Sequence, residues 1–225
     1  MVNVLIFIEG GHPPPADNFV FQSMQTAGNH AAFRQAFHQL FAQYFPSHRF
    51  NLMIQPIGSV SQAKKYLTFL SGSPEMGVIL IDLDAPKHEK PSRLAAYAPL
   101  DTSRIFFMIQ EMEAWPLSQP QKLEKFATEE GLVRKRGEMQ VGDDVLIANR
   151  HPEDISNPSK VLNTLFRKYF AIKKVRGGRV RSKPRSYSKA KDGPRLIGLL
   201  ELPPLAQTFD EVQALIRYIE QASQD

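Results

Sequence analysis

Apolar residues along the chain alternate between short continuous runs and longer stretches with helical spacing. Four short runs that end in turn or polar residues predict buried strands of a parallel sheet; they cover 2–8, 50–57, 77–84 and 105–109. Apolar residues recur three and four positions apart after Asn29 and after Ser59, which predicts helices that end near Pro46 and Gly72. Strands that alternate with helices indicate a mainly parallel central sheet.

The C-terminal half gives helical patterns but few clear strands. Helices are predicted at 120–130 and 158–171, a short one at 92–97, and a last one after the capping box Thr208-Phe-Asp-Glu211. The apolar segment 196–202 fits either a strand or a helix. We therefore expect an α/β fold with a mainly parallel sheet flanked by helices over 1–118. A C-terminal α+β extension over 119–225 is expected to pack with it as one globular unit.

Composition narrows the class of protein without naming a function. The chain has 225 residues, of which 42% are apolar and 23% charged, as is ordinary for a globular protein. No window is long and apolar enough for a membrane-spanning helix, so we expect a cytoplasmic protein with no membrane contact. The absence of cysteine excludes disulfides, thiolate zinc sites and cysteine nucleophiles.

Two aspartates at the end of the third apolar run give the strongest chemical signal. Asp82 and Asp84 are two positions apart, so on a strand both side chains point to the same side at its C-terminal end. Ligands of open α/β sheets bind at that edge. Two like charges so close together repel each other, and a hard cation such as Mg²⁺ explains their placement.

Acidic residues also follow the first and fourth apolar runs. Glu9 precedes two glycines, and Glu111 and Glu113 are again two positions apart. In a parallel sheet these ends meet at one edge, so we expect a carboxylate cluster that binds Mg²⁺ or Mn²⁺ and acts on phosphoryl oxygens. Each acid alone also fits a plain turn, a chance pair or a helix N-terminus, and it is the joint pattern that favours a metal site.

A strongly basic segment spans 173–191. It carries nine Lys or Arg residues, no acid and several glycines, serines and prolines, which predicts a mobile loop. Such a segment attracts polyanions, and an ordinary solvated loop is the alternative. The expected nucleic-acid contacts are Arg176, Arg179, Arg181, Lys183, Arg185 and Tyr187.

Several of these motifs resemble a known family. Ile8-Glu9-Gly10 with the later Ile81-Asp-Leu-Asp84 resembles the TOPRIM signature of topoisomerases, primases, recombination proteins and overcoming-lysogenization-defect nucleases. Phe107-Met-Ile-Gln-Glu-Met-Glu-Ala-Trp115 resembles a segment of a small bacterial TOPRIM-like family, as do Tyr187-Ser-Lys189 and Asp192-Gly-Pro194. The resemblance spans Val4 to the last helix. Members are often encoded beside an AAA-type ATPase and are suspected to act in antiviral defence against phage.

The resemblance implies a role for each matching residue. Glu9 would be a metal ligand or general acid/base, Asp82 and Asp84 metal ligands, and Glu111 with Glu113 would complete the site or hold a second metal. Lys189 would stabilise a phosphate, with Tyr187 nearby. Pro116, where the family tends to have an aromatic residue, and the prolines at 13–15 depart from its pattern.

These expectations point to Mg²⁺-dependent hydrolysis of phosphodiester bonds in DNA or RNA. One alternative is a non-catalytic interaction subunit whose carboxylates contact a partner ATPase. Another is a transferase that uses Asp-x-Asp to hold a metal–nucleotide, although Glu9 and the basic segment have no role there. An aspartate-nucleophile phosphatase fits less well because Glu9 ends the first strand, where the aspartate pair of such an enzyme normally lies.

Overall fold

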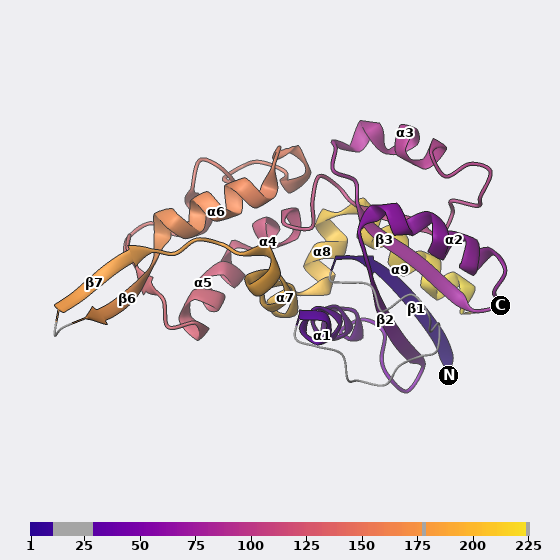
Figure 1. Cartoon of the computed structure of the whole chain (residues 1–225), viewed down its shortest axis with the longest axis horizontal. Helices are drawn as coiled ribbons and strands as arrows, with labels where there is room; N and C mark the ends of the chain where they lie inside the picture. Colours follow the sequence, from indigo (N-terminus) through magenta and orange to yellow (C-terminus); the bar gives the residue numbers. More distant parts are fainter. Residues whose placement is uncertain (11–28, 177–178, 224–225) are drawn as a thin grey trace.

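A four-stranded parallel sheet forms the centre of the N-terminal half (Figure 1). The computed structural model describes residues 1–10, 29–176 and 179–223. The strands follow the order β2-β1-β3-β4, and all three pairings are parallel. Their bounds are Val2–Glu9 for β1, Phe50–Gly58 for β2, Met76–Asp82 for β3 and Ile105–Met108 for β4. The predicted strands and their parallel arrangement are confirmed.

Helices cover both faces of this sheet, which explains why its strands read as continuous apolar runs. On β1, Val4, Ile6 and Ile8 join one buried cluster, whereas Leu5 and Phe7 join another. The first cluster is completed by α1 (Asn29–Ala42), α8 (Leu202–Thr208) and α9 (Asp210–Ala222). The second is completed by α2 (Ala63–Ser71) and residues in and after α3 (Lys90–Ala95).

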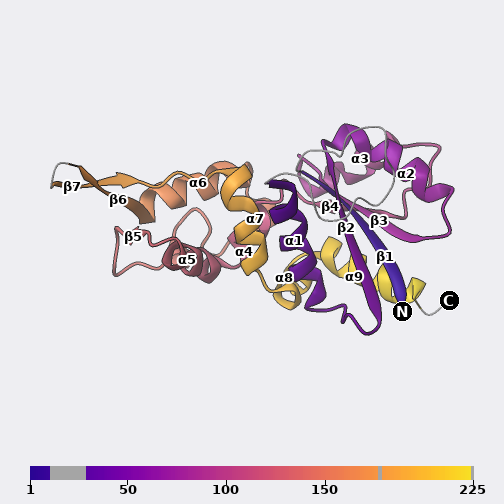
Figure 2. The ribbon, with the colours of Figure 1, turned by 60° about the horizontal axis from the view of Figure 1, so that its bottom comes forward.

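A second core lies beside the first (Figure 2). It packs Phe126 and Phe166 between α4 (Ala114–Ser118), α5 (Pro120–Glu129) and α6 (Pro158–Tyr169). Its antiparallel sheet has the order β5-β6-β7, with β5 at Val133–Arg134, β6 at Phe170–Arg176 and β7 at Arg179–Pro184. Helix α7 (Lys189–Leu199) lies between the cores, because Ile197 belongs to the first and Leu196 to the second. Short 3-10 turns complete the described chain at Val60–Gln62, Lys87–Glu89, Val141–Asp143 and Pro152–Asp154.

The prediction of a mobile loop over 173–191 is wrong. The segment forms most of the β6–β7 hairpin and the first turn of α7. Buried Phe170 and Ala171 anchor β6 in the second core, and cross-strand pairing continues the ladder outward. The apolar segment 196–202 contains the end of α7 and the start of α8, and the extended residues Leu200 and Glu201 lie between these helices. Pro116 lies in the first turn of α4, where proline is tolerated.

Two other local predictions are corrected by the structure. Strand β3 ends at Asp82, and Asp84 has a left-handed backbone (φ 53°), so the two aspartates do not share one side of a strand. The capping box at 208–211 is absent, because Phe209 is the N-cap of α9. Glu211 instead reaches the edge strand β4, where its Oε2 accepts a hydrogen bond from Phe107 N at 3.1 Å and its Oε1 pairs with Lys90.

In the described part of the chain, no helix combines the length and the apolar character needed to cross a membrane. The prolines at 13–15 lie outside the described residues.

Glu211 is therefore expected to fasten α9 to the free edge of the sheet. Glu211→Ala removes a buried charge-assisted hydrogen bond and leaves Phe107 N–H unpaired, so it should lower the free energy of unfolding by about 2–4 kcal/mol. The neighbouring Asp210 forms an exposed ion pair with Lys87, and Asp210→Ala should cost about 1 kcal/mol or less. Urea denaturation compares the two variants, and equal losses would contradict this role of Glu211.

Candidate active site

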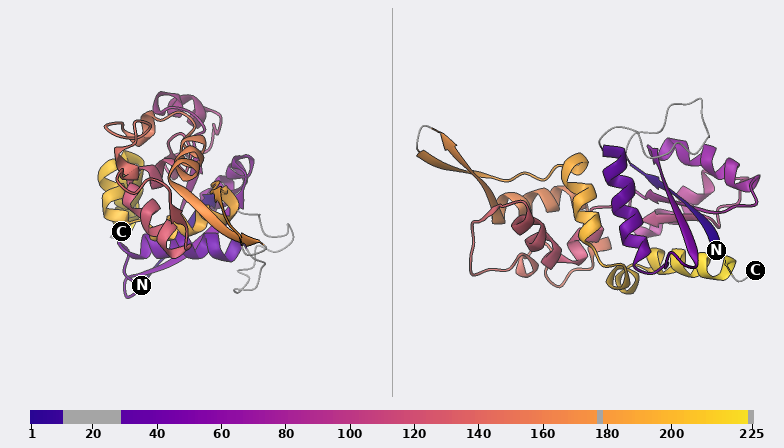
Figure 3. Two further views of the ribbon diagram at one scale, coloured as in Figure 1. Left: turned by 90° about the vertical axis from the view of Figure 1, so that its left-hand side faces the viewer. Right: turned by 90° about the horizontal axis from the view of Figure 1, so that it is seen from below.

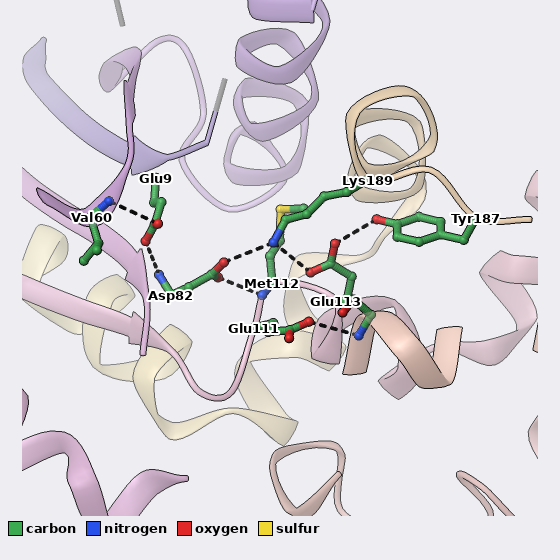
Figure 4. Close-up of polar contacts among 9 residues, drawn as sticks. Glu9, Val60, Asp82, Glu111, Met112, Glu113, Tyr187 and Lys189 are labelled. Atoms are coloured by element: carbon green, nitrogen blue, oxygen red, sulfur yellow. Dashed lines mark hydrogen bonds and ion pairs between the residues drawn. The ribbon is translucent and has the colours of Figure 1, made fainter. Parts of the chain in front are cut away.

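Glu9 joins the carboxyl ends of the two central strands. Its Oε2 accepts a hydrogen bond from Asp82 N at 2.9 Å, and its Oε1 accepts one from Val60 N at 3.1 Å (Figure 4). The chain turns at Gly10, which has a left-handed backbone (φ 113°). A Cβ at Gly10 would lie 2.8 Å from Phe33 Cζ, so a side chain there would displace the turn or the ring. Glycine thus allows Glu9 to reach across to β3.

Asp82 is the buried acid at the centre of the site. It is 6% exposed, its Oδ1 accepts a hydrogen bond from Met112 N at 2.8 Å, and its Oδ2 lies 3.3 Å from Lys189 Nζ. Burial raises its pKa to about 7, and the charges of Glu9, Glu113 and Asp84 add to the shift, although the Lys189 ammonium opposes it. Asp82 therefore keeps its proton to a higher pH than an exposed aspartate does.

Lys189 lies between two acids from different strand ends. Its Nζ is 3.2 Å from Oε2 of Glu113, which is fully buried, and 3.3 Å from Oδ2 of Asp82 (Figure 4). The Lys189 side chain itself is 54% exposed. Burial acts to lower the pKa of Lys189, but the two carboxylates outweigh it and raise that pKa. Lys189 is thus held as a cation between the carboxylates.

Tyr187 orients Glu113 from the other side. Its hydroxyl donates a hydrogen bond to Glu113 Oε1 at 3.0 Å, and its backbone N–H donates one to Asn163 Oδ1 at 3.0 Å. Burial, followed by the charge of Glu113, raises the pKa of Tyr187, so the hydroxyl stays protonated and remains a donor.

The cluster carries more negative than positive charge. Asp82 and Glu113 share the ammonium of Lys189, Glu9 bonds to the backbone of Asp82, and Asp84 lies close enough to raise the pKa of Glu9 and of Asp82. For Glu9, burial is the largest cause of the raised pKa, and its two backbone hydrogen bonds oppose it. The Asp84 carboxylate is exposed and accepts no hydrogen bond from the described residues.

Glu111 does not join this cluster. Its Oε2 accepts a hydrogen bond from Ser159 N at 3.0 Å, in the first turn of α6. The N-cap residue of α6, Asn157, has a left-handed backbone and makes no side-chain cap. A carboxylate is favourable at a helix N-terminus, so Glu111 supplies the missing cap.

The predicted nucleic-acid residues fall into two groups. Arg181 and Lys183 are exposed on β7. Arg176 and Arg179 pair across the hairpin, and their side chains lie outside the described part. Arg185 pairs with the buried Asp192, and Tyr187 binds Glu113, so both support the site from within.

Asp192 and Gly193 support the site residues Lys189 and Tyr187, and the residue patterns alone did not assign them this part. Asp192 Oδ2 accepts a hydrogen bond from Ser188 N at 2.7 Å, which fixes the start of α7 and hence Lys189. A Cβ at Gly193 would lie 3.2 Å from Tyr187 Oη and 3.4 Å from Met112 Cε. The available signal was the position of Asp192 as the first acid after the basic segment.

The carboxylate oxygens and the excess negative charge suit Mg²⁺ or Mn²⁺. However, within the described residues no three histidine, aspartate or glutamate side chains are grouped so that they could hold a metal ion. The oxygens of Glu9, Asp82 and Glu113 face backbone N–H groups, Tyr187 or Lys189 instead. A cation bound by Asp82 and Glu113 would therefore take the place of the Lys189 ammonium.

The fold and site define an α/β protein with a carboxylate–lysine cluster at the C-terminal edge of a parallel sheet. Comparison of the chain with protein-family models, curated proteins and solved structures finds no match.

The raised pKa of Asp82 predicts a pH-dependent stability. In the unfolded chain Asp82 loses its proton near pH 3.8, but in the folded protein near pH 7. Between these values the folded state binds more protons, so rising pH lowers the free energy of unfolding. Asp82→Asn cannot titrate and should lose this part of the decline in urea denaturation from about pH 4 to 7. The exposed Asp143 gives the control, and Asp143→Asn should follow the wild type. Parallel profiles for wild type and Asp82→Asn would contradict the raised pKa.

Proposed function

We propose that this protein is a divalent-metal-dependent nuclease of TOPRIM-like type, which hydrolyses phosphodiester bonds. The observation that carries the proposal is the meeting of Glu9, Asp82 and Glu113 with Lys189 at one sheet edge. Perturbed carboxylates beside a half-exposed lysine are typical of sites that handle protons and phosphate oxygens. The four-stranded parallel sheet is compatible with the fold that the TOPRIM resemblance implies.

Each residue of the candidate site has a defined task in this proposal. Asp82 and Asp84 would hold Mg²⁺ or Mn²⁺, which would supply Lewis-acid polarisation of the phosphoryl group when bound. Glu9, with its raised pKa, accepts a proton from the attacking water more readily than an exposed glutamate does. Lys189 neutralises charge on the phosphate, and Tyr187 holds Glu113 in place.

A second candidate function is a non-catalytic interaction subunit, with an AAA-type ATPase as its partner. It is favoured by the observation that Glu9, Asp82 and Glu113 all have internal partners, as expected of a structural ion cluster. The exposed carboxylate of Asp84 has no such partner in the described part and would have no task in that function.

Plasmid cleavage in Mg²⁺ or Mn²⁺ tests the nuclease. The wild-type protein should nick or cut plasmid DNA, EDTA should stop it, and Asp82→Asn and Asp84→Asn should each lower the rate by about 100-fold or more. Glu111→Gln is the matched control, because Glu111 caps α6 away from the cluster, and it should cleave at close to the wild-type rate.

The controls separate the two functions. Equal cleavage by wild type and Asp82→Asn would place the activity elsewhere and reject the proposed site. Folded wild-type protein that cleaves neither DNA nor RNA with metal, yet forms a stable complex with an ATPase, would favour the interaction subunit.

A further inference from the structure

The β6–β7 hairpin extends away from the body of the molecule as a two-stranded ribbon (Figure 1 and Figure 3). Its strands pair antiparallel in a continuous register from Ala171↔Pro184 to Arg176↔Arg179. The base of the ribbon is anchored in the second core through Phe170, and the neighbouring Ala171 is also buried. An isolated two-stranded ribbon has little stability of its own. The projecting part therefore adds little to the stability of the fold, which suggests that its sequence serves another role.

The register places nearly all of the basic residues on one face. Directly opposed residues share a face of an antiparallel pair, and faces alternate from one pair to the next. We call the positions 172, 174, 176, 179, 181 and 183 the cationic face; its pairs are Ile172↔Lys183, Lys174↔Arg181 and Arg176↔Arg179. The opposite face has the pairs Ala171↔Pro184, Lys173↔Ser182 and Val175↔Val180. Five of six positions on the cationic face are thus basic, against one of six on the other.

This arrangement does not serve the stability of the fold. Like charges directly opposite each other, as at Lys174↔Arg181 and Arg176↔Arg179, destabilise a ladder. Arg181 and Lys183 are exposed and form no ion pair or side-chain hydrogen bond with the described residues. Arg185, just beyond the ribbon, contrasts with them because it pairs with Asp192. The charges of Arg181 and Lys183 therefore remain available for an external polyanion.

We propose that the cationic face of the β6–β7 ribbon binds the sugar-phosphate backbone of double-stranded DNA. A two-stranded ribbon fits the major groove of B-form DNA, which is about 12 Å wide. Successive positions on one strand of this face recur about every 6.8 Å, which equals about two base-pair steps. The deep, narrow major groove of duplex RNA does not admit such a ribbon. The proposal rests on the proposed function in that the bound duplex is the substrate of the carboxylate site.

The ribbon leads directly into that site. Lys189 lies five positions after Pro184, so their Cα atoms are at most about 18 Å apart. This connection is fixed by the ion pair of Arg185 with Asp192 and by the hydrogen bond from Tyr187 to Glu113. The base of the ribbon therefore lies within about one helical turn of B-form DNA, roughly 34 Å, of Lys189.

Binding of the wild-type protein to a fluorescent DNA duplex of about two helical turns tests the proposal. Anisotropy is measured in EDTA over a series of salt concentrations, so that binding is separated from cleavage. Arg181→Gln and Lys183→Gln should each weaken binding several-fold and reduce the slope of log K against log salt by about 0.9. Lys173→Gln removes the same charge from the opposite face and should leave the slope unchanged.

The outcomes distinguish this proposal from the nuclease itself. Equal losses in Lys173→Gln and Arg181→Gln would overturn it, as would binding of single-stranded DNA, duplex RNA or phosphatidylserine vesicles as tightly as duplex DNA. The wild-type protein could also bind duplex DNA through the cationic face and yet cleave no nucleic acid when metal is present. That result would support DNA binding by the ribbon and reject the proposed nuclease function.

Discussion

The ammonium of Lys189 between Asp82 and Glu113 is the interaction on which the arrangement of this molecule depends. Asp82 and Glu113 follow neighbouring strands of the parallel sheet and are almost fully buried. Buried carboxylates without a counter-charge would oppose folding by several kcal/mol. Lys189 begins α7, whose residues enter both cores. The ion pairs that balance the site therefore also join the edge of the sheet to the helix that lies between the two cores.

The loops around this cation depart from ordinary backbone preferences. Asp84 and Gln110 both have left-handed backbones, a conformation that costs a non-glycine residue about 1–3 kcal/mol. The two residues stabilise each other, because Asp84 N donates to Gln110 O at 2.8 Å and Gln110 N donates to Ala85 O at 3.1 Å. The loops after β3 and β4 thus form one unit that positions Asp82, Asp84 and Glu113. Such local strain is concentrated at functional sites more often than elsewhere.

The sheet and half of the site could be predicted from the sequence because they follow from local rules. Strands buried on both faces read as apolar runs, and parallel strands bring the acids at their ends to one edge, which foretold the contact of Glu9 with Asp82. The different roles of Glu111 and Glu113 could not be predicted in this way, because the partner of Glu111, Ser159, is 48 residues away in the sequence. The ribbon was missed because glycines and charges suggested a loop, whereas the alternation that defines its faces depends on pairing between strands.

The balance of charge favours a chemical role for the cluster over a structural one. A structural ion pair needs one acid for each base, but here Asp82 and Glu113 share Lys189, and Glu9 and Asp84 add two further acids nearby. Apolar residues of similar volume would often give an equal or greater stability than such a group. The raised pKa values of Glu9 and Asp82 follow from this excess of negative charge and from burial. A site that keeps carboxylates short of positive charge is suited to receive a cation, a proton or both.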